Sequence, residues 1–372
     1  MRNNLEDVND MKELYSWRAT VVSLTFILIA TVCASGLSSG SAPIQSQPEG
    51  WNLISTPIID TLTAMDFVNS GWAVGNSKWI VKTTDGGTTW KAYNTGAAGR
   101  LSGVDFVDED VGYVCGEYGT ILKSTDGGLT WDIQTSGINT TLNDICFSNR
   151  DVGWCVGMNG VVLATTDGGA TWMPQASNTI DILYCIECVG IKVWAGGLNG
   201  TIIHTKDGGI SWVKQRDDYI VPLYDLCFID ENHGWFASEG YFVNTSNGGK
   251  TWNVISLPGC NRYYGVSFTD KINGWLGGTY GIILYTYDGG KSWTPQDTGT
   301  VFTIYDVVFT SKSIGYACLT SGKILKTNDG GGGLTVFEVS PAPGIAIAAV
   351  SVFLTVSAAA FGYIPPKRRT CS

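Results

Sequence analysis

Three arginines and four acids are the residues of this chain whose types suit chemistry on a carbohydrate. Guanidinium groups hold a substrate carboxylate best through paired hydrogen bonds, and two carboxyl groups about 5–10 Å apart can cleave a glycosidic bond. The arginines are Arg100, Arg216 and Arg262, and the acids are Glu117, Asp217, Asp218 and Glu239. No Arg-Ile-Pro motif accompanies them. Glycan binding or glycoside hydrolysis therefore stays the alternative function, and we predict no catalytic residue.

The sequence gives less support to a metal site, a catalytic nucleophile or nucleic-acid binding than to a carbohydrate site. The two histidines, His204 and His233, have no neighbour at ligand spacing, so a zinc site is not expected. "GLSSG" (36–40) matches G-x-S-x-G but lacks the strand–turn–helix context of a nucleophile. The net charge of −10 leaves no basic stripe for phosphates. We therefore predict no metal, no cofactor and no nucleic-acid partner.

Two pairs of cysteines are spaced closely enough to raise the question of redox chemistry. Cys185 and Cys188 form C-x-x-C, but in a strand this spacing points them to opposite faces, so a shared role is not expected. Cys146 and Cys155 flank a short strand connection and can meet across a hairpin as a disulfide in an oxidising compartment. The alternative is that these thiols fill the core as small apolar groups.

The octet "TTDGGTTW" (83–90) recurs along the chain every 40 or 41 residues. In each copy an aspartate or asparagine precedes a glycine pair, and a carboxylate there can accept hydrogen bonds from nearby backbone N–H groups. Glycine supplies the positive φ that such a turn requires. Because the same box occurs in every repeat, we interpret it as structural. Its members are Asp85, Asp126, Asp167, Asp207, Asn247, Asp288 and Asp329.

A period near 40 residues with strand-like content predicts a β-propeller. Each repeat, for example residues 142–172, contains four short strands, which is one propeller blade. We therefore predict an all-β fold, a seven-bladed β-propeller of four-stranded blades with Asp-box turns over residues 50–338, with hydrophobic helices at both chain ends. The last box lacks its tryptophan, and an unmatched "GWNLIST" (50–56) precedes the first repeat. Either this N-terminal segment or "LTVFEV" (334–339) completes the last blade and removes its exposed edge.

The box resembles the Asp-box (bacterial neuraminidase) repeat, S/T-x-D-x-G-x-T-W. The fuller unit, "GW-x-VG-x-x-G-x-I/V-L-x-T-x-DGG-x-TW", resembles the photosystem II assembly and stability factor family of cyanobacteria and plastids, over residues 51–333. This resemblance implies a seven-bladed, non-enzymatic binding propeller that faces the lumen or the exterior. Family members hold their partner with an arginine-rich patch, whereas this propeller carries only Arg100, Arg150, Arg216 and Arg262.

The innermost strands align in columns that alternate between a bulky and a small or acidic face. The second face includes Asp144, Asp225 and Asp306, which we expect near the central channel. Two interpretations stay open for them. In the first they bind nearby backbone groups, and in the second they form a cation or partner site at the channel mouth.

One face of the propeller gathers side chains of the types found in protein interfaces. This face is formed by the entries of the inner strands and by the turns between second and third strands. Tyrosine and arginine are enriched at the energetic centres of interfaces. The predicted partner-binding residues are Arg100, Glu117, Tyr118, Arg216, Tyr219, Glu239, Arg262, Tyr263 and Tyr280.

Both chain ends are apolar and predict contact with a membrane. Residues 1–36 read as a signal peptide or an N-terminal anchor, followed by a linker at 37–49. After a second linker at 339–343, residues 344–364 are uncharged and long enough to span a bilayer. The basic tail, 365–372, should stay cytoplasmic. We therefore expect a membrane-anchored, extracytoplasmic propeller that binds another membrane or surface protein as an assembly factor.

Overall fold

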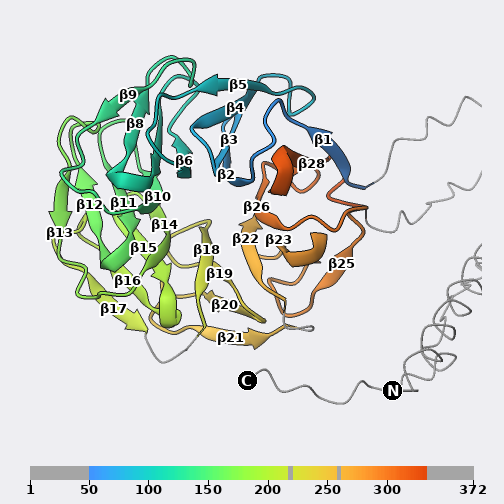
Figure 1. Ribbon diagram of the computed structural model, residues 1–372. Helices are drawn as coiled ribbons and strands as arrows, with labels where there is room; N and C mark the ends of the chain where they lie inside the picture. Colours follow the sequence, from blue (N-terminus) through green and yellow to red (C-terminus); the bar gives the residue numbers. More distant parts are fainter. Residues whose placement is uncertain (1–49, 217–220, 258–260, 333–372) are drawn as a thin grey trace, which may run out of the picture. The chain divides into compact units, whose positions relative to one another are not determined.

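The computed structural model describes residues 50–216, 221–257 and 261–332, and these residues form a ring of seven antiparallel four-stranded sheets (Figure 1). We number the sheets as blades 1–7 in chain order. Within each blade the four strands follow one another from the centre of the ring to its rim, as the label order in Figure 1 shows. The predicted seven-bladed β-propeller is confirmed.

The first four blades have the following strands. Blade 1 contains β2 (Leu62–Phe67), β3 (Gly71–Gly75), β4 (Trp79–Thr83) and β5 (Lys91–Asn94). Blade 2 contains β6 (Leu101–Phe106), β7 (Gly112–Gly116), β8 (Ile121–Ser124) and β9 (Asp132–Gln134). Blade 3 contains β10 (Leu142–Phe147), β11 (Gly153–Gly157), β12 (Val162–Thr165) and β13 (Met173–Gln175). Blade 4 contains β14 (Leu183–Val189), β15 (Lys192–Gly197), β16 (Ile202–Thr205) and β17 (Val213–Arg216).

The remaining three blades repeat this order. Blade 5 contains β18 (Leu223–Phe228), β19 (Gly234–Ser238), β20 (Tyr241–Thr245) and β21 (Asn253–Ser256). Blade 6 contains β22 (Tyr263–Phe268), β23 (Gly274–Gly278), β24 (Ile283–Thr286) and β25 (Thr294–Gln296). Blade 7 contains β26 (Ile304–Phe309), β27 (Gly315–Leu319), β28 (Lys323–Thr327) and β1 (Asn52–Ser55). Single 3-10 turns follow the second strands of five blades, as η1 (Glu117–Gly119), η2 (Met158–Gly160), η3 (Leu198–Gly200), η4 (Thr279–Gly281) and η5 (Thr320–Gly322).

The core lies between the blades and is built from stacked aromatic rings. In the interface of blades 1 and 2, Trp72 stacks on Phe106 with ring centroids 3.5 Å apart, and Trp131 meets the edge of the same Phe106 ring. Such pairs stabilise beyond the area they bury. In every blade except blade 4, the phenylalanine of the inner strand also explains the glycine that opens the second strand. A Cβ at Gly71 would lie 2.1 Å from the Phe67 ring, so no larger residue fits there.

The N-terminal strand closes the ring. β1 pairs antiparallel with β28, with Leu53 opposite Leu325. Trp51 takes the place of the tryptophan that the seventh box lacks, because its ring meets the edge of Phe309 at 5.7 Å and its Nε1 donates to Gln296 Oε1 at 3.0 Å. The first of the two predicted closures is confirmed. Residues 334–339, the alternative, lie outside the described residues.

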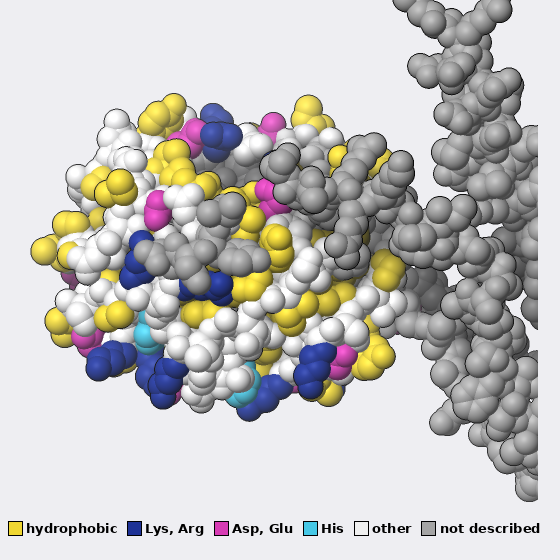
Figure 2. Space-filling view, turned by 90° about the horizontal axis from the view of Figure 1, so that it is seen from below, with side chains coloured by type: hydrophobic (Ala, Val, Ile, Leu, Met, Phe, Trp, Pro, Cys, Tyr) yellow, Lys and Arg dark blue, Asp and Glu magenta, His cyan; other side chains and the backbone are white. Residues whose placement is uncertain are grey.

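The described part of the chain consists of strands, turns and short 3-10 helices. Within it, no helix has the length and hydrophobicity needed to cross a bilayer. The predicted segments at 1–36 and 344–364 lie outside the described residues. Figure 2 shows one side of the rim, where hydrophobic side chains are interspersed with polar ones and basic side chains gather along the lower edge.

Candidate protein-binding site at the channel mouth

Each inner strand begins with a β-bulge, and this bulge builds the candidate site. In β2, Leu62 pairs with Gly75 and Ala64 pairs with Val74, so Thr63 is an extra residue without a partner opposite it. The same shift occurs in all seven inner strands. Bulges re-aim the side chain of the extra residue. The seven bulge residues are Thr63, Ser102, Asn143, Tyr184, Tyr224, Tyr264 and Tyr305, and all seven line the central channel.

Four of these bulge residues are tyrosines of consecutive blades, which we call the tyrosine arc: Tyr184, Tyr224, Tyr264 and Tyr305, from blades 4–7. Successive ring centroids lie 5.9, 4.9 and 5.3 Å apart. The four rings are half-buried. With Arg100, Glu117 and other residues they line a hollow of about 360 Å³, which we call the mouth pocket. Since the strands run antiparallel, this mouth is at the opposite end of the channel from the Asp boxes.

Burial favours the protonated hydroxyl in three of the arc tyrosines. It raises the pKa of Tyr184 and Tyr305, and it raises the pKa of Tyr224 to about 12. A protonated phenol donates and accepts hydrogen bonds and offers an uncharged ring face. The arc is therefore a neutral aromatic surface at physiological pH, suited to contacts with a partner rather than to nucleophilic attack.

Below the arc, six carboxylates line a channel of about 320 Å³. They are Asp66, Asp105, Asp144, Glu187, Asp225 and Asp306. Each of the five aspartates accepts a backbone N–H of the next blade at 2.6–2.9 Å. The bond from Met65 N to Asp306 joins blade 1 to blade 7. The first interpretation of Asp144, Asp225 and Asp306, hydrogen bonding to nearby backbone, is therefore confirmed.

The channel carboxylates titrate at unusually high pH. Burial raises the pKa of Asp66 to about 6 and those of Asp144 and Asp225 to about 7, although the backbone N–H groups act in the opposite direction. Burial also raises the pKa of Asp105, Glu187 and Asp306 well above the ordinary range, and repulsion between these carboxylates adds to it. No lysine, arginine or histidine is among the described residues that line this channel.

Most of the predicted partner-binding residues lie on the mouth side, but they are not equivalent. Arg100 pairs with Glu117 at 2.6 Å, and Arg262 pairs with Glu239 at 3.1 Å. Tyr118 and Tyr280 occupy the centres of η1 and η4, where they are 60% and 78% exposed. Arg216 ends β17. Tyr219, together with the candidate acids Asp217 and Asp218, lies outside the described residues.

The structure corrects the prediction that Tyr263 is a partner-binding residue. It is fully buried between blades 5 and 6, so its side chain is not available to a partner. It occupies the position that leucine holds in blades 1–5, where the side chain points between the sheets. The tyrosine that faces the mouth is its neighbour Tyr264. Sequence reasoning missed the tyrosine arc because it compared the neighbouring columns and not the one that begins at Thr63.

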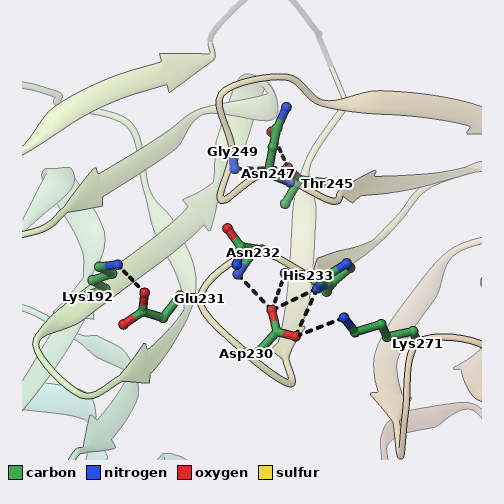
Figure 3. Close-up of polar contacts among 9 residues, drawn as sticks. All are labelled: Lys192, Asp230, Glu231, Asn232, His233, Thr245, Asn247, Gly249 and Lys271. Atoms are coloured by element: carbon green, nitrogen blue, oxygen red, sulfur yellow. Dashed lines mark hydrogen bonds and ion pairs between the residues drawn. The ribbon is translucent and has the colours of Figure 1, made fainter.

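The Asp boxes form hydrogen-bonded turns at the other end of the blades. Asp126 Oδ1 accepts Ser124 Oγ, Leu129 N and Thr130 N, and its Oδ2 accepts Thr130 Oγ1 at 2.6 Å. In blade 5, Asn247 preserves the pattern, since its Oδ1 accepts Thr245 Oγ1 at 3.0 Å (Figure 3). Its Oδ1 also accepts Thr251 N, and its Nδ2 donates to Thr251 Oγ1. The polar atoms of the box side chains are therefore used in hydrogen bonds that hold the turn.

The histidines and the acids near them do not converge on a metal site. His233 Nδ1 contacts Asp230 at 2.8 Å, and Lys271 contacts the same carboxylate at 3.6 Å (Figure 3). His204 stacks on Trp194. Among the described residues, no group of three or more His, Cys, Asp or Glu could hold a metal ion.

Of the two interpretations of Cys146 and Cys155, the structure supports thiols that fill the core and not a disulfide between them. Cys146 pairs in register with Trp154, whereas Cys155 pairs with Ile145. The two side chains therefore point to opposite faces of blade 3. Cys155 packs with Cys115 against blade 2, and Cys146 packs with Cys188 against blade 4. All are free thiols.

Together, the closed ring, the box turns and the lined channel mouth define an Asp-box β-propeller with one aromatic face. The family described as "Photosynthesis system II assembly factor YCF48" matches residues 44–134, 131–222 and 217–300, which is more than half of the chain. The chain belongs to this family.

One curated relative and several solved structures are similar to the chain. "Photosystem II assembly lipoprotein Ycf48" of Prochlorococcus marinus (strain NATL2A) is 35% identical over 106 residues, which is 27% of this chain and 30% of the relative's length. "YCF48 bound to D1 peptide" is 21% identical with a TM-score of 0.64 and covers 78% of this chain and 99% of that chain.

Two further structures share the fold. "YCF48 from Cyanidioschyzon merolae" is 21% identical with a TM-score of 0.64 and covers 75% of this chain and 99% of that one. The Niastella koreensis GH74 enzyme is 13% identical with a TM-score of 0.62 and covers 77% of this chain and 54% of that one. At these identities the similarity concerns the fold alone.

Proposed function

We propose that this chain is a non-enzymatic assembly factor that binds another protein with its channel-mouth face. The observation that carries the proposal is the tyrosine arc, four half-buried rings in contact with one another around a solvent-accessible pocket. Tyrosine and arginine dominate the energetic centres of protein interfaces, and Arg100 and Arg262 lie on the same side.

Membership in the family supports a protein partner. One solved relative is described as "YCF48 bound to D1 peptide", and the curated relative is described as a photosystem II assembly lipoprotein. The proposal transfers only the class of function, assembly through protein binding, to this chain. The identity of the partner is not part of it.

The residues around the mouth favour binding over glycoside cleavage. The candidate acids Glu117 and Glu239 are each paired with an arginine. The five channel aspartates hold backbone N–H groups of the next blade. A glycosidase needs one acid free to protonate the leaving group and another free to attack or activate water.

The site of action that we propose is outside the cytoplasm, next to a membrane. Residues 344–364 are uncharged and are followed by Lys367, Arg368 and Arg369, a pattern typical of a membrane span with a cytoplasmic tail. Residues 1–36 serve in this proposal as a signal peptide or a second anchor. The partner is then a membrane or surface protein within reach of the tether.

A pull-down tests the binding proposal. The full chain, purified in detergent, is incubated with detergent-solubilised host membranes, and bound proteins are identified by mass spectrometry. We expect one abundant membrane protein that is lost with the double variant Tyr224→Ala, Tyr264→Ala. It should be kept with Tyr287→Ala, an exposed tyrosine beside the Asp box of blade 6, at the other end of the channel. Equal capture by all three proteins, or no specific capture, would contradict the proposal.

A further inference from the structure

The tyrosine arc and the channel beneath it have a chemistry that selects one class of partner segment. We propose that the mouth pocket receives a lysine or arginine side chain of the partner protein, with the tyrosine rings around the cation and the channel carboxylates below it. This inference rests on the proposed function and names the chemistry of its partner.

The arc provides the aromatic part of this site. A lysine ammonium or arginine guanidinium is attracted to the face of a tyrosine ring. The chain already makes such contacts from the third strands of two blades, since Lys82 lies 5.4 Å from the Trp72 ring centroid and Lys123 lies 5.4 Å from that of Tyr113. At the mouth the four rings adjoin a solvent-accessible hollow instead. Of the described residues that line the mouth pocket, the one cation is Arg100, and Glu117 pairs with it.

The channel provides the charge complementarity. Six carboxylates lie close enough that their repulsion contributes to several of the raised pKa values, and the described channel lining supplies no cation to offset them. The other titratable side chains of the channel are three thiols, Cys146, Cys185 and Cys227, and the four tyrosines. Burial raises the pKa of each thiol, so none of the thiols supplies a charge near neutral pH. Asp66, Asp144 and Asp225 have pKa values raised to about 6 or about 7, so above neutral pH they are ionised and offer a partner cation negative charge that no cation of the described lining offsets.

The same geometry argues against a bound metal ion in this role. Five carboxylates each commit an oxygen to a backbone N–H of a neighbouring blade, which fixes them around the channel wall. No cluster among the described residues has the arrangement that a metal needs. A flexible side chain with a terminal charge needs no such convergence, because it interacts with the wall as a whole. The carboxylates are already ordered, so binding costs them little conformational freedom.

An acidic partner segment fits the mouth less well. It would need free cations, and Arg100 and Arg262 are each paired with a glutamate. Arg262 also donates to Tyr264, which together with Glu239 raises the pKa of the Arg262 guanidinium. The rim arginines are therefore held in place beside the arc, and above neutral pH the charge beneath the mouth that has no cationic partner is negative.

Binding of a lysine peptide to the full chain tests this inference. The probe is a decapeptide of alternating lysine and glycine, and its matched control is the same peptide with acetylated lysines, which have no charge. Surface plasmon resonance with the immobilised full chain measures both. We expect the charged peptide to bind about tenfold more tightly or better, because acetylation removes the cation–π and Coulomb attraction.

The pH dependence and the variants locate the site. Binding should strengthen from about pH 5 to about pH 8. Asp66, with a pKa of about 6, and Asp144 and Asp225, with pKa values of about 7, ionise over this range while lysine stays charged. Tyr224→Ala should abolish it. Tyr224→Phe, which keeps the ring, should preserve it, and so should Tyr287→Ala, which changes an exposed tyrosine beside the Asp box of blade 6. Circular dichroism checks that each variant is folded.

Several results would overturn the inference. Equal binding of the acetylated peptide, unchanged binding by Tyr224→Ala, tighter binding of a glutamate–glycine decapeptide, or competition by a neutral oligosaccharide would each do so. The pull-down separates this inference from the proposed function. If a partner is captured through the arc but the lysine peptide does not bind, the inference is contradicted and the assembly role is still supported. Lysine-peptide binding without a captured partner would support the inference and count against the assembly role.

Discussion

At the scale of single residues, the Asp box is a set of hydrogen bonds that either a carboxylate or an amide can make. Asp126 and Asn247 hold equivalent turns, and in both the Oδ1 atom accepts the backbone N–H of the threonine four residues on. The difference lies in Thr130 Oγ1, which donates to Asp126, whereas Thr251 Oγ1 accepts from Asn247. A threonine hydroxyl can rotate to do either.

This equivalence predicts the outcome of two substitutions at one position. Asp126→Ala should lower the free energy of unfolding by about 1–2 kcal/mol, because it removes the acceptor of several turn N–H and O–H groups. Asp126→Asn should cost clearly less. Urea unfolding of both variants measures the difference. An alanine variant as stable as the asparagine variant would show that the box side chain does not hold the turn.

The channel carboxylates make stability depend on pH in an unusual direction. Burial raises the pKa of Asp144 to about 7, so between the unfolded value near 4 and this value the folded chain binds a proton that the unfolded chain releases. Stability contributed by this group is therefore present at low pH and is lost as the pH rises toward 7. Asp144→Asn lacks this titration and keeps an acceptor for Ile186 N.

We therefore expect the stability of Asp144→Asn relative to the natural chain to increase from about pH 5 to about pH 8. Asp108→Asn is the control, because Arg150 lowers the pKa of Asp108 and its titration is complete below this range. Urea unfolding at both pH values gives the two differences. A stability difference for Asp144→Asn that does not change with pH would mean that this carboxylate is ionised throughout.

At the scale of elements, strand β1 closes the ring by pairing with β28. It supplies the outer strand of blade 7 and brings Trp51 onto Phe309. Gly50 N also donates to Asp329 of the seventh box at 2.9 Å. The last blade is therefore completed by residues from the other end of the propeller sequence.

Trp51→Ala should destabilise the fold by about 2–4 kcal/mol, since it removes a packed aromatic ring and its bond to Gln296. Leu53→Ala, on the same strand but 46% exposed, should change stability little. Thermal unfolding of both variants measures the contrast. Similar midpoints would mean that closure depends on the β1 backbone alone.

Sequence periodicity predicted the elements well and their irregularities poorly. The box spacing and the G-W-x-V-G strand gave the blade count, because each depends on local turn chemistry and on alternation within one strand. The bulge at Thr63 and its equivalents depends on the register between two strands, which the sequence of one strand does not specify. For that reason the sequence predicts Tyr263 on the partner-binding face, whereas in the structure its neighbour Tyr264 lines the mouth pocket.

At the scale of the whole molecule, the two ends of the channel differ in chemistry. The box end presents turns and ion pairs between blades, such as Asp108 with Arg150 and Asp270 with Lys312. The mouth end presents the tyrosine arc above six carboxylates. We expect the partner at the mouth, because there the rings surround a hollow, whereas the box side chains are occupied within their turns.

Site-specific photo-crosslinking of the full chain in host membranes would show which end of the channel meets the partner. A benzophenone amino acid replaces Ser102, which lines the mouth pocket, in one protein and the exposed Thr88 of a box in another. We predict a crosslink to one membrane protein from Ser102 and none to it from Thr88. A crosslink to a specific partner from Thr88 alone would contradict binding at the mouth.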